Sequence, residues 1–444
     1  MRFSLFESGC LTCLAAIVIV LCLSGITEGR DLCAVLAQVE QHTPALKAAR
    51  AETAVRQAAV RRAKSRYFGE VDAMVKNSNY DSDRLINPMS YPPDLKSKLF
   101  DDNQFSYGIT VRVPLDINGS ITAMVDAAEK RMEAARIHQG DIRLALLHGA
   151  ASLYHSLEGV KAVEEALQKQ VQALTAHIKV ATASIKAGRI PLVEKLRIVA
   201  DKEAVKGKLA SLYGKEQGIR AKLAALMGTD SFSDIVTPVH DLPANTVEPV
   251  DDIMNRPDIR ALRFQTSAAD ADVKATLSQR FPELNINGFW LQNQGFNGEE
   301  GDTWALFIDV KLPLWDGGSR RSAVSGAEAG LRAVRYHLTA LQNQARAEFA
   351  AAKADASAAK ASYTATIASV KAARATERIQ SDRFAKGRVS AADLVDAEAA
   401  LAGARSDRAL ALTYWWQAED RIRHAVGLIP IAYKGHDAMS QSKR

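Results

Sequence analysis

The sequence "RFAKGRVSAADLVDAE", residues 383–398, interrupts a long Ala-rich helical stretch at Gly387 and restarts it at Ser390. A similar sequence, "SIKAGRIPLVEKLRIVADKE", occupies residues 184–203, with Gly188 and Pro191 at the corresponding places. Glycine tolerates the left-handed backbone that ends many helices, and serine and proline are favoured where the next helix starts. Both segments are therefore predicted to be turns at which a long helix reverses direction.

The two turns belong to an internal duplication. Three pairs of landmarks are each separated by 199 residues: "VPLDINGS" (113–120) and "LPLWDGGS" (312–319), Gly188-Arg189 and Gly387-Arg388, and Met227-Gly228 and Val426-Gly427. Chance similarity between Ala-rich helices would not maintain one spacing over such a length. Each half is predicted to contain an opening helix, a strand hairpin, and two very long helices joined by the turn.

Alternating segments define the strand hairpins. Residues 105–113 and 304–312 alternate apolar and polar side chains, with Phe105 and Trp304 at the loop ends, and a weaker alternation precedes each of them. A period of two indicates strands, and each run is close to the ~10 residues that a tilted strand needs to cross a bilayer. Strands of a soluble sandwich are the alternative. Two hairpins cannot close a barrel, so several chains would have to contribute.

The long helices have a different period. Between Ala150 and Ile185, apolar residues recur about every 3.5 residues, which is the spacing of a coiled-coil seam. A helix over 120–186 would be a rod of roughly 100 Å. Taken alone, these helices favour a soluble coiled-coil hairpin; the attached strand hairpins and the duplication argue against it.

The N-terminus is predicted to be a secretory signal peptide. Arg2 precedes the apolar run "LTCLAAIVIVLCL" (11–23), and small residues follow up to Gly29, after which cleavage is expected. An uncleaved membrane anchor is the alternative, although the run is shorter than the roughly 20 residues of a spanning helix. Only Cys33 would remain after cleavage, so no internal disulfide is possible.

Several function classes lack support in the sequence. The net charge of +6 is spread out, without a basic face carrying interleaved aromatic residues, so no nucleic-acid binding is expected. We find no Gly-rich phosphate loop and no nucleophile–base arrangement, so neither enzymatic activity nor a cofactor is expected. His148 and His155 share a helix face but lie about 10.5 Å apart by helical rise. They are interpreted as surface or packing residues, and no metal site is expected.

The two strand hairpins, the turns "VPLDINGS" and "LPLWDGGS", and the tips "KAGRIPLVE" (186–194) and "KGRVSAADLVDAE" (386–398) together resemble the TolC-like outer-membrane efflux proteins, the OEP family, over about residues 31–428. The resemblance implies a homotrimer in the outer membrane of a Gram-negative bacterium that extends into the periplasm. A transmembrane β-barrel of 12 strands, four from each chain, would join a periplasmic all-α coiled-coil barrel.

The function implied by this resemblance is that of a passive exit channel in a tripartite efflux or type I secretion system, gated at the periplasmic helical tips. Its implied partners are outer-membrane lipid, a periplasmic adaptor (membrane fusion protein) and an inner-membrane pump. A periplasmic coiled-coil adaptor is the alternative, although an adaptor should have one helical hairpin rather than two. A secreted hydrolase is a third class, which no nucleophile–base pair supports.

The resemblance also assigns roles at the tips. It places Asp393, Asp396 and Glu194 at the periplasmic aperture, where three chains would form stacked carboxylate rings that favour cations. Stabilisation of a helix N-terminus by acidic residues is the alternative. Adaptor docking is assigned to Gly188, Arg189, Gly387 and Arg388.

The sequence departs from the family at two positions that close the mouth in a known member. Val389 and Phe384 stand where that member has Arg and Tyr. The closing contacts of this chain are therefore expected to differ.

The expected organisation follows from these assignments. It comprises a signal peptide (1–29); a first repeat (31–228) with helices at about 31–66, 120–186 and 190–227 and strands at about 68–77 and 104–115; an inter-repeat segment (229–252) at the equator of the helical barrel; a second repeat (253–428) with helices at about 253–280, 319–386 and 390–427 and strands at about 282–292 and 302–314; and a polar tail (429–444).

Overall fold

A computed structural model describes residues 32–80, 103–233, 242–243, 250–296, 298 and 300–430. The expected signal peptide, nearly all of the expected loop at 84–103, most of the inter-repeat segment and residues 431–444 of the tail lie outside this described part. The chain divides into two compact units. The helical unit comprises Met1–Pro44, Arg143–Val250 and Glu348–Arg444, and the strand unit comprises Ala45–Ile142 and Asp251–Ala347.

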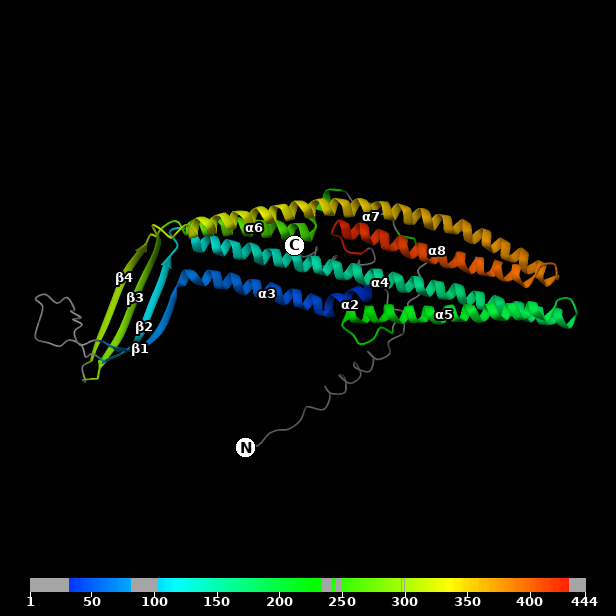
Figure 1. The fold of residues 1–444 in the computed structure, drawn as a ribbon, viewed down its shortest axis with the longest axis horizontal. Coiled ribbons are helices and arrows are strands. Elements are labelled where there is room, and N and C mark those ends of the chain that lie inside the picture. The colour runs from blue at the N-terminus through cyan, green and yellow to red at the C-terminus, as the bar shows by residue number, and fades with distance from the viewer. Residues whose placement is uncertain are drawn as a thin grey trace, which may run out of the picture. The chain divides into compact units, whose positions relative to one another are not determined.

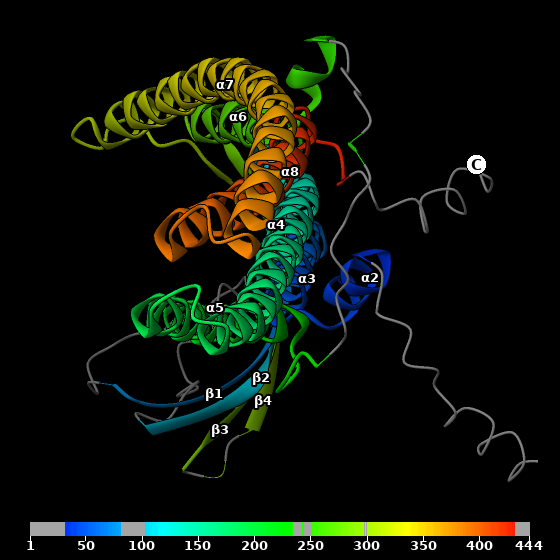
Figure 2. The same ribbon diagram turned by 90° about the vertical axis from the view of Figure 1, so that its right-hand side faces the viewer.

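The strand unit contains one curved sheet of four antiparallel strands in the order β1-β2-β3-β4 (Figures 1 and 2). Their bounds are Glu70–Asn79 for β1, Asn103–Leu115 for β2, Glu283–Gly295 for β3 and Glu300–Lys311 for β4. Pairing of β2 with β3, for example Val111 opposite Gly288, joins the hairpins of the two repeats. Gly108 allows this pairing, because a Cβ atom there would overlap the carbonyl oxygen of Trp290.

One face of the sheet carries a band of apolar side chains that crosses all four strands. Paired positions place Ile109 of β2 opposite Trp290 of β3, which in turn lies opposite Trp304 of β4. The side chain of Trp304 is 72% exposed, and Leu306, Ile308 and Val310 beside it along the strand are exposed as well. An exposed apolar band of this kind indicates a surface that contacts lipid or another protein. Toward the loop ends the same face becomes polar, with Gln292 of β3 opposite Asp302 of β4.

The other regular elements of the described residues are helices. The shorter ones are α2 (Leu32–His42), α3 (Pro44–Ser65) and α6 (Pro257–Ser278), with 3-10 turns η1 (Arg66–Phe68) and η2 (Val250–Asn255). The long ones are α4 (Ser120–Lys186), α5 (Leu192–Met227), α7 (Ser319–Ala385) and α8 (Ala391–Ala425). Within the described residues, no helix is both long enough and apolar enough to span a membrane.

The four long helices form two hairpins, α4 with α5 and α7 with α8 (Figure 1). Each repeat therefore carries one strand hairpin and one long helical hairpin, and the predicted fold class is confirmed. A core at the base of the first hairpin packs α2 against α4 and α5, with Leu36, Leu157 and Leu223 fully buried.

Candidate functional site

The tips of the two helical hairpins have the same backbone geometry. At the end of α4, the N–H of Arg189 donates to the carbonyl of Ser184 and the N–H of Gly188 donates to Ile185, both at 2.9 Å. At the end of α7, Arg388 and Gly387 make the equivalent bonds to Arg383 and Phe384, also at 2.9 Å. This pair of bonds is the Schellman motif, which needs a left-handed residue at its turn. Gly188 has φ 67° and Gly387 has φ 68°, so glycine is required at both tips.

The helix that returns from the second tip starts with a complete capping box. The hydroxyl of Ser390 accepts from the N–H of Asp393 at 3.2 Å, and a carboxylate oxygen of Asp393 accepts from the N–H of Ser390 at 3.1 Å. The Ser390 hydroxyl also donates to the same carboxylate oxygen at 2.7 Å. These hydrogen bonds with Ser390 lower the pKa of Asp393 below its usual value, so the residue is ionised at neutral pH.

The helix that returns from the first tip has no such box. Its N-cap residue is Pro191, whose side chain caps nothing, and proline has no N–H for an acidic side chain to accept. Glu194 occupies the position that corresponds to Asp393, and it contacts the other hairpin instead. Its Oε2 accepts a hydrogen bond from the N–H of Ala391 at 2.5 Å. That N–H belongs to the first turn of α8, where backbone donors have no partner within the helix.

A shared apolar cluster lies directly behind the tips. It contains buried residues from both hairpins: Leu174, Ala181, Ile198, Val205, Phe384, Ala391, Leu394 and Val395. The ring of Phe384 is only 2% exposed, and Val389 packs partly buried against the same cluster. Phe384 and Val389 therefore contribute to the apolar contact between the two tips.

The residues assigned to the aperture and to docking lie on the outside of this cluster. Asp393 and Asp396 are exposed, and Glu194 is half-buried by its contact with Ala391. The two aspartates are three residues apart and therefore share one face of α8. The glycine–arginine pairs at 188–189 and 387–388 are exposed at the two turns. The tips thus present basic turns next to an acidic helix face.

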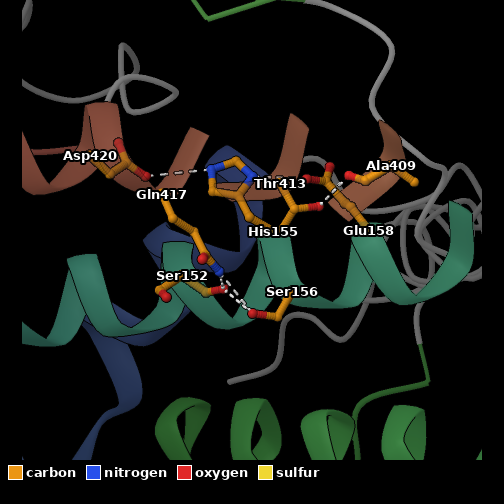
Figure 3. Close-up of polar contacts among 8 residues, drawn as sticks. All are labelled: Ser152, His155, Ser156, Glu158, Ala409, Thr413, Gln417 and Asp420. Atoms are coloured by element: carbon orange, nitrogen blue, oxygen red, sulfur yellow. Dashed lines mark hydrogen bonds and ion pairs between the residues drawn. The ribbon is translucent and has the colours of Figure 1, made fainter. Parts of the chain in front are cut away.

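Sequence reasoning missed a buried ionic cluster within the helical unit (Figure 3). His155 of α4 donates from Nδ1 to Glu158 at 2.8 Å and lies with Nε2 3.4 Å from a carboxylate oxygen of Asp420 on α8. Its ring stacks on Trp416 at 5.4 Å between centroids. Burial alone would lower the pKa of His155, but the Asp420 and Glu158 carboxylates raise it to about 9.

The second of the two histidines considered from sequence behaves in the opposite way. His148 is half-buried, its Nε2 lies 2.7 Å from the carbonyl of Leu428, and its ring contacts His424 at 4.8 Å. Burial lowers its pKa to about 4, although the hydrogen bond to Leu428 partly opposes this shift. His148 is thus neutral where His155 is charged. The sequence interpretation of both as surface or packing residues agrees with the half-buried His148 and the buried His155, but it did not include the ion pairs of His155.

A comparison with protein-family models matches residues 35–229 and 251–428 to the family described as "Outer membrane efflux protein". The matched ranges cover both repeats and therefore more than half of the chain.

Individual relatives are similar at lower levels of identity. The chain is 26% identical to outer membrane protein OprJ of Pseudomonas aeruginosa over 262 residues, which are 55% of this chain and 53% of OprJ. It is 22% identical to the solvent efflux pump outer membrane protein SrpC of Pseudomonas putida over 243 residues, 51% of this chain and 50% of SrpC. The matches thus span about half the length of these relatives.

The fold is shared with solved structures. The outer membrane protein VceC of Vibrio cholerae superposes with a TM-score of 0.77 at 22% identity, over 89% of this chain and 96% of VceC. The sequence resemblance to TolC-like proteins is therefore confirmed in both sequence and fold, and the chain belongs to the outer membrane efflux protein family.

Proposed function

We propose that this protein is a passive exit channel of the Gram-negative outer membrane that serves a tripartite efflux or type I secretion system. The single observation that carries the proposal is the exposed apolar face of the four-stranded sheet, attached to two long helical hairpins. Membership of a family of outer-membrane efflux channels supports this function. The same match supports the channel over the periplasmic adaptor, because it includes both repeats.

The sheet itself argues for a homotrimer. It is open at β1 and β4, whose outer edges have no partner strand within the described part of the chain. Backbone groups in a bilayer must be paired within the protein, so an open sheet must close against further copies. Its strands of 10 to 13 residues are long enough to cross when tilted. Three copies would supply 12 strands, with the apolar face toward lipid.

The tips are the proposed gate and docking surface. In a trimer, Asp393, Asp396 and Glu194 would form rings of carboxylates at the periplasmic aperture, and such rings favour cations. The exposed turns at 188–189 and 387–388 would receive a periplasmic adaptor, which connects to an inner-membrane pump. The relative SrpC is the outer membrane protein of a solvent efflux pump, which supports a partnership of this kind.

The proposal is tested by single-channel recording in planar bilayers. The parent should give small cation-selective openings that divalent cations block from the periplasmic side. The variant Asp393→Asn/Asp396→Asn should conduct without that block. A matched control is Asp126→Asn/Glu129→Gln on α4, which removes two acids at the same spacing from the strand unit and should leave the block intact.

Each unexpected outcome has a separate meaning. If the parent conducts and both variants behave like it, the channel assignment survives and the acidic gate is wrong. If the parent never inserts or conducts, the channel assignment itself is wrong.

A further inference from the structure

Three ionisable side chains from three helices meet inside the helical unit, below the tips. They are His177 of α4, Glu377 of α7 and Glu398 of α8, and one ligand atom from each lies within 4.8 Å of the other two. His177 Nε2 is 2.9 Å from Glu398 Oε1. His177 is 9% exposed and Glu398 is 4% exposed, while Glu377 is half-buried. In the part of the chain that the structure describes, no other three such residues come this close.

The charges of this cluster do not balance. Two carboxyl groups share a buried space with one imidazole, and like charges at short range cannot both ionise without a nearby cation. Burial raises the pKa of Glu377, and the adjacent Glu398 raises it further. His177 and Arg405 act in the opposite direction without reversing the shift. A cation bound between the two carboxyl groups would offset their repulsion.

We propose that His177, Glu377 and Glu398 bind one divalent transition-metal ion per chain, for which Zn²⁺ is the natural probe. One imidazole nitrogen and two carboxylate oxygens, with water in a fourth position, are a donor set suited to tetrahedral Zn²⁺. The nitrogen ligand argues against Ca²⁺ and Mg²⁺, which prefer oxygen.

The required movement is small. Ligand atoms about 2.0–2.2 Å from a tetrahedral ion lie roughly 3.4 Å from one another, so the present spacings, which are within 4.8 Å, have to contract by about 1.4 Å at most. Side-chain rotation about the two glutamate stems supplies that without moving the helices.

The position of the site gives the ion a structural role. His177 lies on α4 between Leu174 and Ala181, and Glu398 lies on α8 one turn beyond Leu394. These three apolar residues belong to the cluster behind the tips. A bound ion would link the hairpin of the first repeat to that of the second. The inference does not depend on conduction, since it concerns how one chain holds its own hairpins together.

The other clusters described above do not combine an available imidazole nitrogen with two carboxyl groups. His155 already contacts a carboxylate with each of its ring nitrogens and retains its proton to a pKa of about 9. Asp393 and Asp396 are exposed and bring no nitrogen ligand. A cation bound at those aspartates would have an all-oxygen shell, which is spectroscopically different.

The test is a titration of the purified full-length protein in detergent with Co²⁺ after removal of metals by a chelator. The parent should show one saturable site per chain with the visible absorption of tetrahedral Co²⁺, and Zn²⁺ should displace it. Glu377→Gln should weaken binding at least tenfold while keeping the fold, because a carboxamide has nearly the size of the carboxyl group but no negative charge for a cation. Its melting temperature without metal should equal or exceed that of the parent.

Two controls separate this site from other carboxylates. His138→Gln removes an exposed histidine that pairs with Asp141 on the same helix α4, and it should bind Co²⁺ like the parent. Asp393→Asn/Asp396→Asn should also keep the site. Unchanged Co²⁺ binding in Glu377→Gln, or no saturable binding in the parent, would overturn the proposal.

X-ray absorption of the Zn²⁺-loaded parent decides the question without a variant. The expected first shell contains one imidazole nitrogen among oxygens at about 2.0–2.1 Å. A shell made only of oxygen would assign the ion to the exposed acids and refute the inference.

Discussion

The charge on His155 should make the stability of this protein fall as the pH rises from 6.5 to 10. The folded chain holds the imidazolium between Glu158 and Asp420, which raises its pKa from 6.5 to about 9. At ~1.36 kcal/mol for each pH unit between folded and unfolded pKa, the difference corresponds to about 3 kcal/mol per chain. A group with a raised pKa contributes fully below its unfolded pKa. The contribution is therefore complete below pH 6.5 and is lost as the pH passes through 9.

The assay is thermal unfolding followed by circular dichroism at 222 nm, at half-unit steps from pH 6 to pH 10. The parent should lose apparent stability progressively above pH 6.5. In Glu158→Gln/Asp420→Asn, His155 has lost both carboxylates, so its imidazole should already be neutral over this range and the decline should disappear.

A control accounts for general effects of alkaline pH and of lost acids. Glu52→Gln/Asp126→Asn removes two carboxylates from exposed ion pairs with Arg56 and Lys130. It should keep the decline of the parent, because surface pairs contribute about 0–1 kcal/mol. If the variant without Glu158 and Asp420 carboxylates declined as steeply as the parent, the charged state of His155 would not be the cause and the reasoning would fail.

Three further predictions concern single contacts. Glu194→Ala should remove the acceptor of the Ala391 N–H and make hydrogen exchange at that amide roughly tenfold faster. This is the effect of losing a ~1.4 kcal/mol hydrogen bond to a charged group. Exchange as slow as in the parent would mean that the contact does not hold the tips together. Gly159→Ala should destabilise the chain by about 1 kcal/mol, because the new Cβ overlaps the Thr413 hydroxyl. Adding Thr413→Ala should restore the melting temperature. If it does not, this overlap is not the cause. The pKa of His148 is lowered to about 4, so its contribution to stability is complete above pH 6.5 and is lost as the pH falls through 4. His148→Gln should therefore reduce the loss of melting temperature at acidic pH. An unchanged loss would exclude His148 as its cause.

The duplication and the two periodicities predicted two repeats, each with a strand hairpin and a long helical hairpin, and the family resemblance supplied the barrel architecture. The alternation around Trp304 and the 3.5-residue spacing after Ala150 are local properties, so a single sequence displays them. The constant offset between Gly188 and Gly387 then related the two halves. The equivalent Schellman motifs at these glycines give that offset its physical reason, since each repeat must end a long helix at the same place.

Contacts between the two repeats could not be predicted from the sequence. The pairing of His155 with Glu158 is visible as a spacing of three residues on one helix, but Asp420 comes from the second repeat. His177 likewise meets a partner 221 residues away. No periodicity indicates which face of α4 will turn toward α8, and the pKa of a buried group depends on that packing. The histidines therefore looked isolated in the sequence.

The aperture residues remain a prediction, yet the structure shows how one substitution makes the two repeats unequal. Glu194 and Asp393 occupy equivalent positions, three residues after Pro191 and Ser390 respectively. Ser390 has an N–H, which Asp393 accepts to cap its own helix. Pro191 has none, so the longer side chain of Glu194 is available to accept from Ala391 of the other hairpin. One acid therefore fixes its own helix and the other joins the two tips. For the gate proposed above, this division makes Glu194 the residue through which movement of one hairpin would reach the other.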